Sequence, residues 1–157
     1  MKQQQKICNY LKALTVVLVI LVLAFFTGAT LYAFHVKKLL YGDFIWTFIF
    51  FSWFIAILCI LTLALFWKVC TQIGNDNSFS LENAMYFHRM ALLGVIAGVS
   101  YLVRPVYYGI MKCFRIETLV YSIFLALACA AFFILCEALS KLIRNAYDIK
   151  QENDLTI

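Results

Sequence analysis

Four apolar runs dominate the sequence, and each is long enough to cross a lipid bilayer, which takes about 20 helical residues. They occupy residues 13–34, 44–67, 90–111 and 118–139. Because backbone polar groups surrounded by lipid must be bonded within their own segment, each run predicts a helix. The sequence therefore predicts an all-α membrane protein, a four-transmembrane-helix antiparallel bundle that forms one integral membrane domain, 1–157.

The composition excludes a soluble domain of this size. Hydrophobic residues make up 65% of the chain and charged residues only 13%, too few for a water-exposed surface. The net charge of +5 comes from basic residues at the ends of the apolar runs. This placement is typical of topology signals and lipid head-group contacts, so membrane lipid is an expected partner and direct nucleic acid binding is not.

Basic residues also predict the orientation. With the N-terminus inside, eight lysines and arginines flank the inner ends of the runs and four flank the outer ends. The positive-inside rule then places both termini in the cytoplasm. The soluble parts are a cytoplasmic loop, 68–89, and a cytoplasmic tail, 140–157. The first run is too long for a cleaved signal peptide and is expected to be a retained anchor.

The loop contains a turn-rich stretch, 74–78, followed by residues that favour a helix start. Ser80 is placed to act as the N-cap, and Glu82 falls in the first turn, where a negative charge is favourable. We expect a short amphipathic helix along the inner interface that leads into the third span. His88 and Arg89 at its end would meet anionic lipid.

The tail is expected to continue the fourth helix to about Lys150, with an apolar side that packs on the loop helix. The last residues, QENDLTI, offer an apolar terminus for capture by a partner, although simple fraying explains most chain ends. Together the loop and tail supply the candidate partner contacts. These are Phe79, Ser80, Asn83, Glu152, Asn153, Asp154, Leu155 and Ile157.

The stretches NDNSFSLENAMYFHRMALLG and LIRNAYDIKQENDLTI resemble an uncharacterised family of small bacterial four-span membrane proteins (YoaS-like, a domain of unknown function). Members often carry Pro before the loop phenylalanine, where this chain has Ser78. The resemblance implies a bacterial cell membrane protein without established catalytic residues. It also implies a partner, because members are often encoded beside a small helix-turn-helix regulator.

The polar residues within the runs do not form a catalytic set, which needs several groups converging in one pocket. There is no carboxylate pair and no histidine in the middle of a span. The six cysteines contain no C-x-x-C pair, and no spacing suits a metal. We therefore expect no enzyme activity, no cofactor and no metal.

Arg104 stands before the only proline, Pro105, inside the third run. A charge within a span is usually functional, but Arg104 lies only about 10 Å from the outer end at 1.5 Å per residue. We expect its side chain to extend outward to Glu117, Asp43 or lipid phosphate. Pro105 should bend the helix and free the carbonyl of Tyr101, which Ser100 or the guanidinium would satisfy.

Glu137 lies near the inner end of the fourth run, about 15 Å from Arg104 in depth. It is therefore expected to pair with Lys141, His88 or Arg89 instead. Gly94 and Gly98 form a G-x-x-x-G face on the third run. Such faces let helices approach closely, within one chain or, as the alternative, in a homodimer.

The preferred interpretation is a non-enzymatic regulatory or stress/immunity accessory protein that acts through its cytoplasmic loop and tail. The alternative is an oligomeric transport or channel subunit. That alternative requires polar residues along a shared path, for which Arg104, Ser52 and Thr62 are the candidates.

Overall fold

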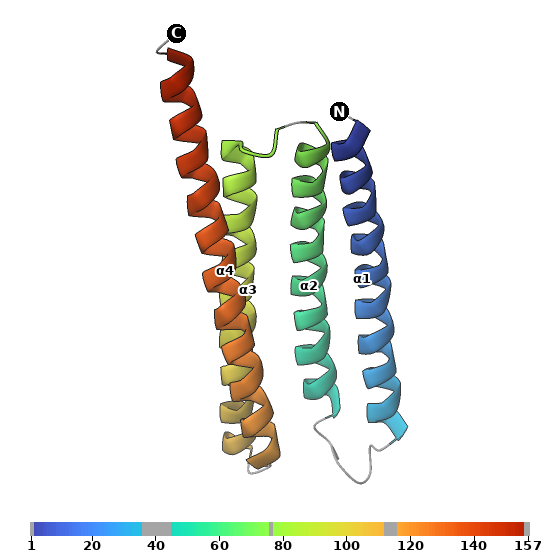
Figure 1. Cartoon of the computed structure of the whole chain (residues 1–157). Helices are drawn as coiled ribbons and strands as arrows, with labels where there is room; N and C mark the ends of the chain where they lie inside the picture. The colour runs from blue at the N-terminus through green and yellow to red at the C-terminus, as the bar shows by residue number, and fades with distance from the viewer. Residues whose placement is uncertain (1, 36–44, 76, 112–115, 156–157) are drawn as a thin grey trace.

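Four long helices make up the computed structural model, which describes residues 2–35, 45–75, 77–111 and 116–155. They are α1 (Lys2–His35), α2 (Ile45–Gly74), α3 (Leu81–Ile110) and α4 (Ile116–Leu155), and they run alternately up and down (Figure 1). All four are long and apolar enough to cross a membrane, and the described ranges contain no strand. The predicted four-span, multi-pass, all-α architecture is confirmed.

The helices extend beyond the apolar runs. α1 begins at Lys2, well before residue 13, and α4 continues to Leu155, past the expected end near Lys150. Backbone hydrogen bonding propagates through these polar segments because neither contains proline or glycine, the two residues least compatible with a helix interior. The polar ends of α1 and α4 are therefore helical.

The helices pack as two antiparallel pairs. α3 lies along α4 with the most extensive contact, α1 lies along α2, and the α2–α3 contact joins the pairs. Among the described residues no Cα atoms of α1 and α4 approach within 8 Å. The four-helix arrangement is therefore open between its first and last helices, as the separation of α4 from α1 in Figure 1 shows.

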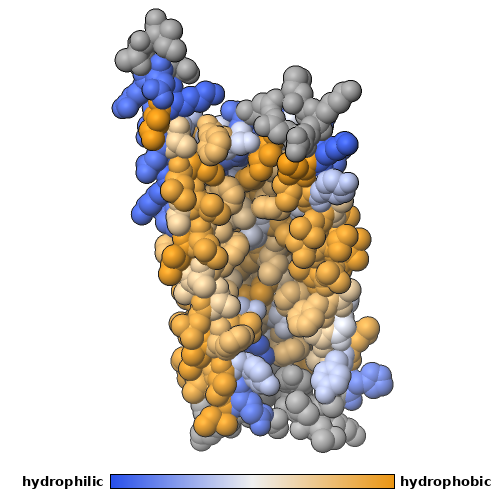
Figure 2. Space-filling view, in the orientation of Figure 1, coloured by the Kyte–Doolittle hydropathy of each residue, from blue (hydrophilic) through white to orange (hydrophobic). Residues whose placement is uncertain are grey.

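The lateral surface is largely hydrophobic, and hydrophilic residues gather at the two ends (Figure 2). Many large apolar side chains along the spans are exposed, Phe25, Ile110 and Leu127 among them. In water this exposure would be unfavourable, whereas in a bilayer lipid tails cover it. We call the end that holds both termini and the α2–α3 connection the terminal end (Figure 1).

The separate interfacial helix predicted before the third span is not present. α3 runs without a break from Leu81 to Ile110, and α2 continues to Gly74, so only residues 75–80 connect them. Two contacts hold the first turns of α3 against α4: Ser140 Oγ donates to the carbonyl of Ala84, and His88 pairs with Glu137. These turns therefore follow α4 instead of lying in the membrane plane.

Candidate functional site

Ser80 and Asn83 organise the connection between α2 and α3. Ser80 Oγ accepts a hydrogen bond of 3.2 Å from the backbone N–H of Asn83, as the predicted N-cap requires. Asn83 Nδ2 donates to the carbonyls of Asn77, at 3.2 Å, and Ser78, at 2.9 Å. Both side chains are buried, and only 1% of the surface of Asn83 is exposed. These contacts lie within the chain, whereas Asn83 Oδ1 is buried without a hydrogen-bond partner among the described residues.

Phe79 differs from these two neighbours because 60% of its surface is exposed. It precedes the buried cap at the terminal end, on a connection that Ser80 and Asn83 hold in place. Of the three loop residues predicted to contact a partner, Phe79 is thus the one that presents its side chain outward. The other two determine where it stands.

The pairing of His88 with Glu137 confirms one of the three alternatives expected for Glu137. His88 Nδ1 and Glu137 Oε2 lie 2.8 Å apart. Arg89 is exposed on the next position of α3. Together with the Ser140–Ala84 hydrogen bond of 2.7 Å, the pair fixes the register of α3 against α4 near the terminal end.

Glu137→Gln is expected to lower the free energy of unfolding by less than about 1 kcal/mol, because a solvent-accessible ion pair contributes little. Half of the His88 side chain is exposed, which permits this screening. Reversible unfolding in mixed detergent micelles measures the change. A loss of several kcal/mol would contradict the assignment of the pair as peripheral.

The end of α4 projects beyond the other helices. Ser140 lies opposite Ala84, the fourth residue of α3, so α4 passes the start of α3 near Arg144. The remaining residues, 144–155, extend about 18 Å at 1.5 Å per residue, as Figure 1 shows. We call residues 142–155, which comprise this extension and the two residues before it, the projecting segment.

Apolar side chains remain exposed on the projecting segment. Leu142 and Ile149, seven residues apart, are 64% and 60% exposed. The expectation that this side packs on the loop is therefore only partly met, because Ile143 and Ala146 are half-buried and these two are not. Near its end, Gln151 Nε2 donates to Tyr147 Oη at 2.9 Å.

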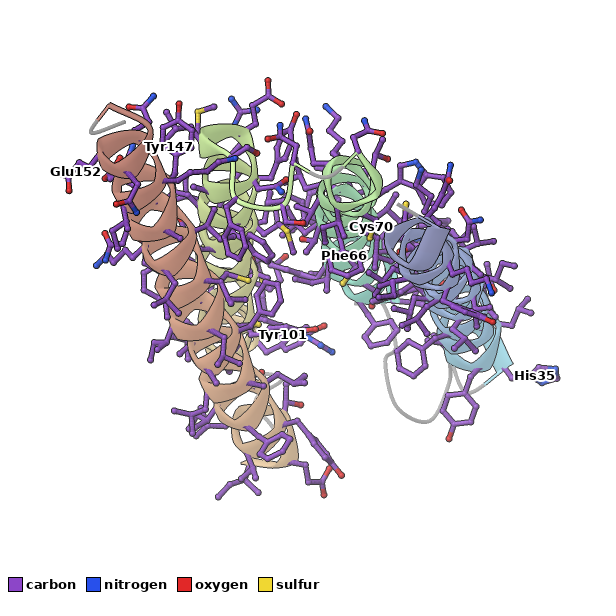
Figure 3. The ribbon with its side chains drawn as sticks, turned by 45° about the horizontal axis from the view of Figure 1, so that its top comes forward. His35, Phe66, Cys70, Tyr101, Tyr147 and Glu152 are labelled. Atoms are coloured by element: carbon purple, nitrogen blue, oxygen red, sulfur yellow. The ribbon has the colours of Figure 1, made fainter. Side chains whose placement is uncertain are left out.

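The predicted tail contacts belong to the same segment. Glu152 and Asn153 are exposed on it, and Figure 3 shows Tyr147 and Glu152 near its tip. Ile157 lies outside the described residues, as do the side chains of Asp154 and Leu155.

The contacts of Arg104 differ from those that the sequence predicted. Its guanidinium lies over the rings of Phe48, 5.1 Å from the centroid, and Tyr108, at 5.7 Å. The side chain is half-buried between helices, and its Nε is buried without a hydrogen-bond partner among the described residues. It forms no ion pair with Glu117, and Asp43 lies outside the described residues. Tyr108 stands one turn closer to the end of α3, and Phe48 stands three residues after the start of α2 at the same end of the molecule. The direction of the side chain agrees with the expectation, but the guanidinium meets aromatic rings instead of the predicted acidic partner Glu117.

Pro105 is buried within a continuous α3. Ser100, one of the two groups expected to satisfy the carbonyl of Tyr101, instead donates to the carbonyl of Ile96 at 2.7 Å. This is the usual bond of a serine to the preceding helical turn. Ser100 therefore does not supply the hydrogen bond that was expected for the carbonyl of Tyr101.

Arg104 lines a cavity of about 230 Å³ between the helix pairs. Figure 3 shows Tyr101, another lining residue, pointing from α3 into the space between the pairs. All four helices contribute to the wall. The lining residues are Phe25, Phe26, Ala29, Phe48, Phe51, Ser52, Ile55, Ser100, Tyr101, Arg104 and Leu125.

The charge of Arg104 is poorly compensated there. Removing an ion from water costs several kcal/mol even after relaxation, whereas a desolvated cation–π contact returns about 2 kcal/mol. Sequence reasoning missed this site because it considered depth alone. A signal was present on α2, where Phe48, Phe51, Ser52 and Ile55 recur at helical spacing and so share one face.

Two of the three residues proposed for a transport path line this cavity, Arg104 and Ser52. Thr62, the third, does not line it, and its Oγ1 donates to the carbonyl of Leu58 at 2.9 Å. The described residues thus bring together only part of the polar path that the alternative function required.

Gly94 and Gly98 are buried where α3 meets α4. A β-carbon on Gly94 would lie 2.9 Å from Phe132 Cδ1, and one on Gly98 would lie 3.3 Å from Cys129 Cβ. The G-x-x-x-G face is therefore used within the chain. A β-carbon on Gly28, in a similar small-residue pattern on α1, would meet nothing within 4 Å.

Potential metal ligands do not cluster in the part of the chain that the structure describes: no group of three His, Cys, Asp or Glu side chains could hold an ion. Cys8 and Cys70 are buried free thiols, and Cys113 lies outside the described residues. Two polar regions therefore remain as candidate sites: the terminal end and the Arg104 cavity.

Comparisons with curated proteins and with solved structures give no match. A family model described as a protein of unknown function (DUF2975) matches residues 2–157, nearly the whole chain. This agrees with the resemblance to an uncharacterised family of four-span proteins, and its description carries no activity to set beside the two regions. The chain belongs to the DUF2975 family of proteins of unknown function.

Proposed function

We propose that this protein is a non-enzymatic regulatory component of a bacterial cell membrane that holds a cytoplasmic protein at its terminal end. The observation that carries the proposal is the projecting segment. It extends as a helix beyond α3 and exposes Leu142 and Ile149. An amphipathic helix of this kind binds by laying its apolar side into the groove of a partner.

The charges of the projecting segment favour a water-soluble protein as its partner over a membrane surface. The projecting segment mixes both signs, with Arg144 and Lys150 alternating with Asp148 and Glu152. Mixed charge is typical of a solvated helix and unlike the basic face of a helix that lies on a membrane. The excess of lysine and arginine on this side favours a cytoplasmic location.

Phe79 extends the same surface. It is an exposed aromatic side chain on a connection held by buried hydrogen bonds, a combination that favours binding because little conformational freedom is lost. The resemblance to four-span proteins encoded beside a small helix-turn-helix regulator favours such a regulator as the partner, with a stress or immunity accessory role.

The test uses the full chain in nanodiscs and, as the probe, a purified small helix-turn-helix regulator of the kind encoded beside proteins that this chain resembles. Replacing both Leu142 and Ile149 by Ala is expected to weaken binding at least tenfold, since burial of such side chains contributes about 1.5–3 kcal/mol each. Leu127 and Ile134, exposed on the same helix at the same spacing, provide the matched control. Their double alanine variant should bind as the wild type does.

Two results would overturn the proposal. One is no measurable binding of the regulator to the wild-type protein. The other is equal binding by both double variants, which would remove the projecting segment from the interface.

Phe79→Ala reports separately on the loop and is expected to weaken binding without changing the thermal midpoint, because the exposed ring has little packing to lose.

A further inference from the structure

The Arg104 cavity combines a cation with an apolar wall. Aromatic rings from three helices form much of that wall: Phe25, Phe26, Phe48, Phe51 and Tyr101. Ser52 and Ser100 add hydroxyl groups. Ligand sites commonly have this composition, an apolar lining with a few polar groups that orient the occupant.

The described residues supply no anion for this cation. The ion pair His88–Glu137 lies near the terminal end, while Arg104 stands six residues before the opposite end of α3. Its buried Nε has no hydrogen-bond partner, and neither has the buried hydroxyl of neighbouring Tyr108. Aromatic faces attract the cation, but they do not occupy all of its N–H groups with hydrogen bonds. The guanidinium therefore retains N–H donors for a ligand.

The position of the cavity limits the kind of anion. Six residues correspond to about 9 Å along the helix, so Arg104 lies inside the hydrophobic part of the lateral surface. A soluble inorganic anion would have to lose its hydration to reach this depth. An acid attached to a hydrocarbon chain already resides in the bilayer and arrives with its apolar part in place.

The size of the cavity limits the anion further. Its 230 Å³ is below the roughly 300–1,000 Å³ of sites that enclose a drug-sized molecule. It can admit an acidic group and part of one hydrocarbon chain, but not the body of a two-chain phospholipid. A single-chain acid also carries its charge directly on the chain, so the charge can follow the chain below the head-group level.

We propose that this cavity binds the carboxylate end of a long-chain fatty acid. The two carboxylate oxygens accept paired hydrogen bonds from the Arg104 guanidinium, whose planar fork matches them. The first part of the chain lies against the phenylalanine rings, and the remainder extends into the bilayer. This inference goes beyond the proposed function and does not depend on it, because the projecting segment lies at the other end of the molecule.

The experiment titrates the full chain, in nanodiscs of a zwitterionic lipid, with radiolabelled oleic acid. The wild type is expected to show one saturable site per chain. Arg104→Gln should weaken binding about tenfold to hundredfold, the ratio that corresponds to losing hydrogen bonds to a charged group. Lys6→Gln also removes a positive charge, at an exposed position of α1 near the terminal end, and should leave binding unchanged.

A second variant guards against a misfolded Arg104→Gln protein. Ala29 lines the cavity from α1, and Ala29→Phe fills the space while the guanidinium stays. Saturable binding should be lost in this variant too. Oleyl alcohol, which has the chain without the charge, should bind at least tenfold more weakly than oleic acid.

Three results would overturn the inference. They are equal binding of oleyl alcohol and oleic acid, wild-type affinity in both cavity variants, and displacement of oleic acid by phosphatidylglycerol at an equal mole fraction. The last would assign the cavity to a two-chain phospholipid, against the size argument.

Discussion

Gly94→Leu is expected to force α3 away from α4 and to lower the free energy of unfolding by about 3 kcal/mol, the upper part of the range for overpacking. A β-carbon alone at this position would lie 2.9 Å from Phe132 Cδ1 and 3.6 Å from the carbonyl oxygen of Cys129. The ring would have to move, and the carbonyl belongs to the backbone of α4. Reversible unfolding in mixed detergent micelles measures the loss.

Gly28→Leu is the matched control. It makes the same substitution within a span, at a glycine whose β-carbon would meet nothing within 4 Å. Little change in stability is expected. An equal loss of stability in both variants would contradict the packing argument. It would instead favour the alternative in which small-residue faces join two copies of the chain. The mass of the protein–detergent complex would then show whether it contains one copy or two.

Asn83→Ala is expected to cost about 2 kcal/mol, because two hydrogen bonds of about 1 kcal/mol each are lost. The side chain that makes them is almost completely buried and binds the carbonyls of Asn77 and Ser78. Without it the α2–α3 connection loses the bonds that hold its turn. Unfolding measures the energy, and faster proteolytic cleavage of the connection reports where the change occurs.

Asn75→Ala serves as the control in the same connection, because Asn75 is exposed and its backbone N–H, which the substitution keeps, donates to the carbonyls of Thr71 and Gln72. It should change stability by less than about 0.5 kcal/mol, as surface substitutions usually do. If Asn83→Ala behaved like Asn75→Ala, the buried amide would not be what organises the turn.

Local patterns allowed several features to be predicted correctly. The four spans follow from run length, and the Ser80 cap follows from its place before an apolar helical stretch. The His88–Glu137 contact followed from depth counting on antiparallel neighbours, since both residues lie near the same end. Each of these depends on spacing along one helix or on the alternation of helix direction.

Features that depend on side-chain direction between helices were not predicted. Arg104 was expected to meet Glu117, Asp43 or lipid phosphate, whereas its guanidinium lies over the ring of Phe48. The interfacial helix was inferred from a cap and an amphipathic stretch, which are equally compatible with the continuous first turns of α3. The contacts of Ser140 and Glu137 decide between the two, because they hold the first turns of α3 alongside α4.

The sequence by itself determined that this chain crosses a membrane four times as helices, because lipid leaves the backbone no other way to satisfy its hydrogen bonds. Only the tertiary structure decided which faces of those helices meet. In lipid the apolar faces are nearly equivalent, so close packing of small residues such as Gly94 selects the neighbours. That choice leaves α1 and α4 apart, places Arg104 at the wall of an aromatic cavity and lets α4 project beyond α3.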